Sequence, residues 1–235
     1  QVVQEMIKSP VSALLIQHPT MGNILVDTGN SPYYHGEYSR ETLETYPIVE
    51  YIAIEAALAE KGLTVNDIDM IVWTHLHFDH AGGLRYFAGT KAIQHVIVAE
   101  EELKNAWFSV MTGNSGAYVK RLFDVEGMVC QTYRDQLTLG DGLTLFAQKC
   151  HTPACTGLVI RTGSGRVVID TSDTVYTRES FEKRIAPGGH INKTRSEFFE
   201  NLDRLTELQK RCGGEFLFGH DYEQICTYSR QGWIE

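Results

Sequence analysis

The sequence contains no apolar run that approaches the roughly 18 residues needed to span a bilayer; segments such as MIVW at 70–73 and VVI at 167–169 have the length of strands. It also has no excess of positive charge, because 21 lysine and arginine residues face 30 aspartate and glutamate residues, a formal net charge of −9. Nucleic acids and anionic membranes favour clustered Lys and Arg. We therefore expect neither a nucleic acid nor a membrane as partner.

A disulfide framework is also missing. The number of cysteines is odd and their spacing is not compact, which predicts reduced thiols in a cytoplasmic protein; the five are Cys130, Cys150, Cys155, Cys212 and Cys226. The chain begins with Gln1 and not with methionine, so we expect N-terminal residues to be missing.

The sequence does contain short apolar strands that alternate with amphipathic helices. Strands are predicted at 12–17, 23–26, 68–73, 95–99 and 215–218, and hairpins at 136–151 and 156–173. Helices are predicted at 48–61, in the residues after 99, and where Phe198, Leu202, Leu205 and Leu208 recur every three or four positions. Without repeats or linkers, this pattern indicates one mixed α/β (α+β) domain over residues 1–235.

Polar residues follow nearly every predicted strand. They are Asp27, the segment 75–80, His151, the segment 170–173 and His220. Because strand ends in layered α/β folds converge on one edge, we expect these residues to meet there and to form a site.

The densest of these groups is THLHFDHAGGL at 74–84. Side chains two apart at a strand end point the same way, so His75 and His77 can bind one ion while Asp79 and His80 turn to a second. Imidazole and carboxylate suit zinc, iron, manganese or cobalt. A histidine-rich polar loop without metal is the alternative, but its protonated histidines would repel one another.

Further ligands must come from elsewhere in the chain. The candidates are the residues at other strand ends, for each of which a purely structural role is the alternative: His151, Asp170 or Asp173, and His220.

The motif resembles the HxHxDH signature of the metallo-β-lactamase-fold hydrolases. The segments ILVDTG at 24–29 and CHTPACTG at 150–157 are similar to neighbouring motifs of that superfamily. DTVYTRESFE at 173–182 and FGHDYEQ at 218–224 resemble the N-acyl homoserine lactone lactonase family. One departure is Cys155, which stands where the family often has a further histidine.

The resemblance implies an αβ/βα sandwich with a dinuclear metal site, most simply of two zinc ions. His75, His77 and His151 would bind one ion, Asp79, His80 and His220 the other, and Asp173 in preference to Asp170 would bridge them. Tyr176 would face the substrate carbonyl, Phe78 would form an apolar wall, and Asp79 would also relay a proton.

The implied function is opening of a lactone ring, as in quorum quenching, by attack of a metal-bridging hydroxide. The partner is then a small-molecule ester or lactone, and a homodimer is one candidate oligomeric state. Two alternatives use the same site: hydrolysis of another lactone, such as a vitamin-derived one, or of a phosphoester. A third lies outside enzymes, a non-catalytic metal-binding protein.

Overall fold

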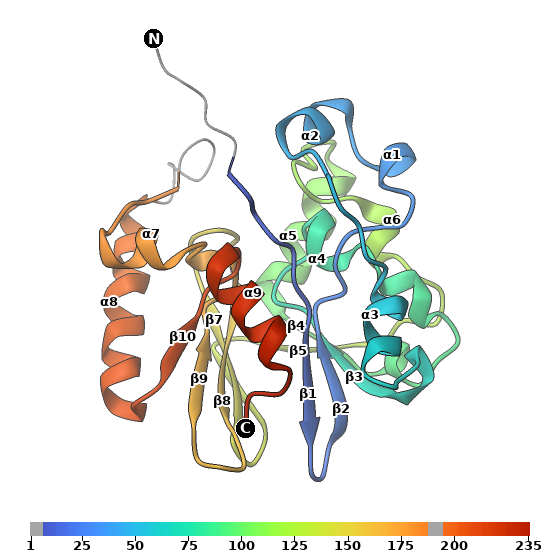
Figure 1. The fold of residues 1–235 in the computed structure, drawn as a ribbon. Coiled ribbons are helices and arrows are strands. Elements are labelled where there is room, and N and C mark those ends of the chain that lie inside the picture. The colour runs from blue at the N-terminus through green and yellow to red at the C-terminus, as the bar shows by residue number, and fades with distance from the viewer. Residues whose placement is uncertain (1–6, 188–194) are drawn as a thin grey trace.

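The computed structural model describes residues 7–187 and 195–235, which form two five-stranded sheets packed face to face with helices on both outer sides (Figure 1). The first sheet has the order β1 (Leu14–His18), β2 (Gly22–Val26), β3 (Ile68–Val72), β4 (Val96–Ala99) and β5 (Cys130–Tyr133). The second has the order β10 (Glu215–Leu217), β9 (Val167–Asp170), β8 (Cys155–Arg161), β7 (Leu143–Gln148) and β6 (Gln136–Gly140).

Strand direction brings several carboxyl ends to the same region of each sheet. In the first sheet β2, β3, β4 and β5 run parallel, and only β1 pairs antiparallel. In the second sheet β9 and β10 are parallel, while the other pairs are antiparallel. Polar segments that follow β2 and β3, or β9 and β10, therefore leave their sheets at the same edge.

The core is layered, as the alternation of side chains along the strands requires. Ile24 and Val26 pack between the two sheets against Leu145 and Leu158 of the second sheet. Leu25, which lies between them on β2, faces the outer helices instead. This four-layer arrangement confirms the predicted αβ/βα sandwich.

Helices cover both outer faces. The α-helices are α1 (Tyr34–Glu37), α2 (Arg40–Thr45), α3 (Ile54–Glu60), α4 (Phe78–Ala81), α5 (Glu100–Met111), α6 (Lys120–Phe123), α7 (Arg178–Glu182), α8 (Arg195–Cys212) and α9 (Tyr222–Gln231). Short 3₁₀ turns are η1 (Val65–Asp67), η2 (Leu84–Phe87), η3 (Ala92–Gln94) and η4 (Ser172–Thr174). Helices α3, α5 and α6 pack on the first sheet, and α8 packs on the second through Phe198, Leu202 and Leu205.

The predicted helix at 48–61 is wrong in its first half, because α3 begins only at Ile54. Ile48, Val49 and Ile52 are β-branched and disfavour helix. Val49 and Ile52 are also exposed, so no buried face compensates for that preference. Strand β5 and helix α9 were not predicted, although the Asp221 side chain that caps α9 by accepting from the Gln224 amide is a recognisable start signal.

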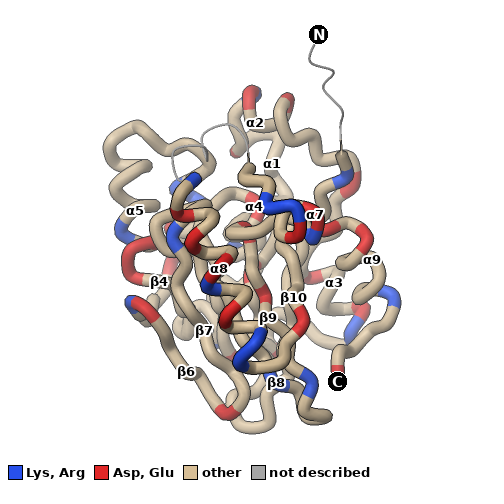
Figure 2. The backbone as a smooth tube through the Cα atoms, turned by 90° about the vertical axis from the view of Figure 1, so that its left-hand side faces the viewer, with Lys and Arg blue, Asp and Glu red and all other residues tan. Residues whose placement is uncertain are grey.

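Charged residues of both signs are interspersed over the described part of the chain, as Figure 2 shows. Several form pairs one helical turn apart, such as Lys104 with Glu100 and Lys210 with Glu207. Among residues 7–187 and 195–235, no helix has both the length and the apolarity needed to cross a membrane.

Leu205 tests the packing of α8 on the second sheet. Its side chain is 1% exposed, and Leu205→Ala should lower the free energy of unfolding by about 2–5 kcal/mol because it leaves a cavity in the core. The exposed neighbour Arg204 is the control, and Arg204→Ala should change the same quantity by less than about 0.5 kcal/mol. Urea denaturation measures both; equal effects would contradict the packing described.

Candidate metal centre

The motif at 74–84 lies where β3 gives way to the short helix α4. His75 and His77 occupy the connecting segment, and Asp79 and His80 lie in α4 itself. His151 follows β7, Asp173 lies in η4 after β9, and His220 follows β10. The structure therefore brings together all seven predicted ligands, from both sheets.

Three histidines form a first triad whose ligand atoms lie within 4.8 Å of one another: His75, His77 and His151. His151 Nε2 is 3.0 Å from His75 Nε2 and 2.9 Å from His77 Nδ1. Burial holds the pKa of His75 well below its usual range and lowers that of His77 to about 4 and that of His151 to about 3. These rings are therefore neutral at pH 7, the form in which imidazole binds a cation.

A second triad consists of Asp79, His80 and His220, again within 4.8 Å. His80 Nε2 is 3.7 Å from Asp79 Oδ2. In both histidines of this triad the Nδ1 atom makes a hydrogen bond away from the site. His80 Nδ1 donates to Asp27 Oδ2 at 2.7 Å, and His220 Nδ1 donates to the Pro10 carbonyl at 2.8 Å. Both Nε2 atoms are thus oriented toward the site.

Asp173 lies between the two triads. Its Oδ2 is 3.1 Å from His220 Nε2 and 3.4 Å from His151 Nε2, and its Oδ1 is 3.4 Å from His80 Nε2. Although burial opposes the shift, the surrounding imidazoles, His220 first, hold the pKa of Asp173 well below its usual range. Asp173 is consequently a buried carboxylate with a negative charge that both triads share.

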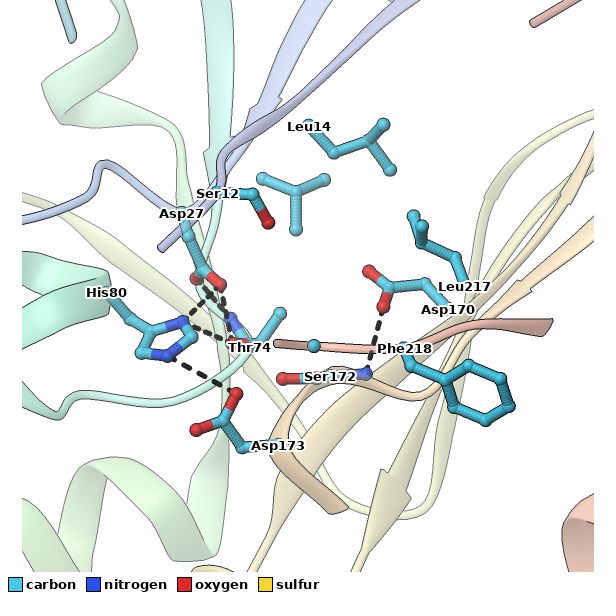
Figure 3. A pocket seen from close by; sticks show the side chains of 12 residues that line it. Ser12, Leu14, Asp27, Thr74, His80, Asp170, Ser172, Asp173, Leu217 and Phe218 are labelled. Carbon is cyan, nitrogen blue, oxygen red and sulfur yellow. Dashed lines mark hydrogen bonds and ion pairs between the residues drawn. The ribbon is translucent and has the colours of Figure 1, made fainter. Parts of the chain in front are cut away.

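Asp170 does not reach the triads. One carboxylate oxygen accepts the Ser172 amide at 2.9 Å, and the side chain lines a small cavity together with Asp27 and Ser12, next to His80 and Asp173, which also line it (Figure 3). Burial raises its pKa to about 7. Ser172 adopts a left-handed φ of 46°, and this turn separates the directions of Asp170 and Asp173.

The donor set fits divalent metal ions. His80 Nε2 and Asp173 Oδ1 are buried and form an ion pair at 3.4 Å (Figure 3), but neither atom makes a hydrogen bond with the described residues. Buried polar atoms without partners are costly unless an ion or water binds them. Nitrogen and oxygen ligands in two groups that share one carboxylate suit zinc, iron, manganese or cobalt better than calcium or magnesium.

Two predicted substrate contacts border the first triad and α4. The Tyr176 hydroxyl is 3.1 Å from His151 Nδ1, and burial, followed by the charge of Asp173, raises the pKa of this phenol well above its usual value. Phe78 packs against Tyr38, with ring centroids 4.7 Å apart, and lies 6.3 Å from the ring of Tyr46.

Asp27 is a residue whose role was not predicted, although it was noted as a polar residue after a strand. Its carboxylate accepts from the Thr74 amide at 2.8 Å, from the Thr74 hydroxyl at 2.6 Å and from His80. It therefore fixes both the start of the motif and the ring of His80. A signal for this role was weak, because its partners lie about fifty residues away in the sequence.

Asp170 and Asp173 provide a matched test, since both are buried carboxylates on the same connection. Asp173→Asn should reduce the bound metal below two ions per chain, because the shared negative charge is lost. Asp170→Asn should retain both ions, because the amide oxygen can still accept the Ser172 amide. Elemental analysis of purified protein measures this, and metal loss in the Asp170 variant alone would contradict the geometry.

Comparison with known proteins identifies the family. The model of the metallo-beta-lactamase superfamily matches residues 7–220. The chain is 29% identical to the N-acyl homoserine lactonase AiiB of Agrobacterium fabrum, over 100% of this chain and 88% of that protein. It is 28% identical to an N-acyl homoserine lactonase of a Bacillus species, over 94% and 84% respectively.

A solved structure gives the same result in three dimensions. An N-acyl homoserine lactone hydrolase, determined with the product N-hexanoyl-L-homoserine at its catalytic metal center, aligns with a TM-score of 0.77 and 26% identity. The alignment covers 97% of this chain and 87% of that one. Together with the match over residues 7–220, this shows that the chain belongs to the metallo-beta-lactamase superfamily.

Proposed function

We propose that this protein is a metal-dependent hydrolase that opens the lactone ring of N-acyl homoserine lactones. The observation that carries the proposal is the pair of triads around Asp173, in which two buried ligand atoms have no hydrogen-bond partner. Relatives named N-acyl homoserine lactonases, aligned over nearly the whole chain, support the substrate class. A product-bound structure of a similar hydrolase supports the location of the chemistry at a metal centre.

The site would hold two divalent ions, which we propose to be zinc. His75, His77 and His151 would bind the first, and Asp79, His80 and His220 the second, with Asp173 shared between them. Asp27 and the Pro10 carbonyl keep the second triad's imidazoles oriented, so those ligands need little rearrangement on binding. When bound, such ions lower the pKa of water and polarise an ester carbonyl.

Tyr176 would bind the carbonyl oxygen of the lactone. If His151 Nε2 were to bind an ion, the ring proton would lie on Nδ1 and would be donated to the Tyr176 oxygen. The phenolic hydrogen is then free for the substrate oxygen, where negative charge develops during attack. Asp79, in the second triad, would take a proton from the attacking water and pass it to the leaving alkoxide.

Phe78 would provide an apolar wall beside the reacting ester. Its ring packs on the buried Tyr38 and lies beside the exposed Tyr46, so these rings would offer an apolar surface at the start of α4. Such a surface favours a substrate that has an apolar portion beside its ester, because both can be buried together. The proposed partner is therefore a small amphipathic lactone.

Metal-loaded protein should hydrolyse N-acyl homoserine lactones, with little activity on other lactones or on phosphoesters. A pH-stat assay detects the acid that ring opening releases, and a chromogenic assay detects phosphoester cleavage. His151→Ala should abolish the activity, because it removes a ligand of the first triad. Cleavage of a phosphoester but of none of the lactones would overturn the proposal. A chelator should abolish the activity, and added Zn²⁺ should restore it.

Tyr176→Phe should lower kcat by about 100-fold, the low end of the cost of removing one donor to a developing oxyanion. The metal content should stay at the wild-type value, because the hydroxyl is not among the ligand atoms of either triad. Tyr222→Phe, at an exposed tyrosine outside the site, is the matched control and should not change kcat. Equal rates for the two variants would show that the phenol has no part in the reaction.

A further inference from the structure

Helix α5 contains a carboxylate that is fully buried, although glutamate is almost never found so unless it is paired. This residue, Glu102, is 0% exposed, whereas its neighbours Glu100 and Glu101 pair with the exposed Lys104. Burying a carboxylate costs several kcal/mol unless hydrogen bonds compensate for the loss of water. The groups that compensate for Glu102 all belong to segments that hold the first triad.

The first of these groups is the backbone amide of Leu76, which donates to Glu102 Oε1 at 2.9 Å. Leu76 stands between His75 and His77, and its side chain is completely buried in the core. One hydrogen bond therefore fixes the short extended segment that points both histidines into the site.

The second group is the hydroxyl of Tyr118, which donates to the same Oε1 at 3.1 Å and accepts from the Asn105 amide at 3.0 Å. The backbone of Tyr118 forms an isolated β-bridge with His77. Its ring also packs on the His77 ring with centroids 4.7 Å apart. Tyr118 thus transmits the position of Glu102 to His77 through two independent contacts.

The third neighbour of Glu102 follows a strand of the other sheet. Burial raises the pKa of the Glu102 carboxyl, and Thr152, which directly follows His151, opposes that rise, although its buried hydroxyl makes no hydrogen bond with the described residues. Glu102 is therefore hydrogen-bonded to groups that hold His75 and His77, and it lies beside the segment that carries His151. Asp79, His80 and His220 have different supports, among them Asp27 for His80 and the Pro10 carbonyl for His220.

We propose that Glu102 is the positioning residue of the first metal-binding triad, and that it does not set the affinity of the second. The inference rests on the metal centre proposed above. A second buried carboxylate, Asp27, holds His80 of the second triad, and through the Thr74 hydroxyl it also reaches His75.

Single-triad backgrounds make the inference testable by metal affinity alone. His220→Ala leaves the first triad complete, and His151→Ala leaves the second complete. Adding Glu102→Ala should weaken Zn²⁺ binding 10- to 100-fold in the His220→Ala background, as loss of a group that orients a ligand does. In the His151→Ala background it should leave the affinity unchanged. Competition with a chromophoric chelator measures both values.

Three further variants control the experiment. Glu102→Gln keeps a carbonyl oxygen for the Leu76 amide and the Tyr118 hydroxyl, and should recover most of the affinity. Glu101→Ala removes an exposed carboxylate from the same helix and should change neither affinity. Tyr118→Phe, which removes only the hydroxyl that donates to Glu102, should weaken binding of the first ion by about tenfold. This variant decides the question if Glu102→Ala fails to fold.

The inference would be overturned if Glu102→Ala weakened Zn²⁺ binding equally in the two backgrounds, or if it weakened binding in neither. Wild-type protein serves as the reference for the proposed function. If it binds no Zn²⁺, the metal centre is wrong and the inference falls with it. If it binds two ions but Glu102→Ala and Tyr118→Phe leave the affinity for the first unchanged, only the role of Glu102 is wrong.

Discussion

The structure depends on keeping a negative carboxylate, Asp173, buried between five imidazoles and a second carboxylate. Removing such groups from water is unfavourable unless opposite charge or oriented hydrogen bonds replace the solvent. Asp173 obtains this compensation from His80, His151 and His220, all within 3.4 Å of its oxygens. Burial also keeps the imidazoles of the first triad neutral. The site therefore combines the nitrogen lone pairs of that triad with the negative charge of Asp173, which lies between the two triads.

Much of the fold can be understood as the means of holding these groups in place. Two sheets provide polar segments after β3, β7, β9 and β10, and each sheet is anchored by its own apolar layer. Behind the imidazoles, acceptors fix the ring orientations: Asp27 for His80 and the Pro10 carbonyl for His220. Across the left-handed turn at Ser172, Asp173 reaches the imidazoles, while Asp170 accepts the Ser172 amide and lines the adjoining cavity. Rigid ligands that need little rearrangement favour tight metal binding and a defined reaction geometry.

Local patterns predicted most of the strands well. Alternating or continuous apolar residues located β1, β2, β3, β4 and the two hairpins of the second sheet, because these signals depend on near neighbours. The helix expected from Ile48 begins only at Ile54, because Val49 and Ile52 are β-branched and exposed and gain no packing that would offset their weak helix preference. Strand β5 was missed, since half of its residues are exposed and its apolar pattern is weak.

By itself, the sequence determined that ionisable residues follow the strands and that 74–84 has metal-ligand spacing, because spacing along one segment is a local property. The preference for Asp173 over Asp170 came from resemblance to a family, and the turn at Ser172 gives it a geometric basis. Only the tertiary structure decided which residues support the ligands. Glu102 accepts hydrogen bonds from Leu76 and Tyr118, which hold His75 and His77, and Asp27, which follows β2, accepts from His80 in α4. Such contacts join residues far apart in the chain, and no periodicity or spacing in the sequence encodes them.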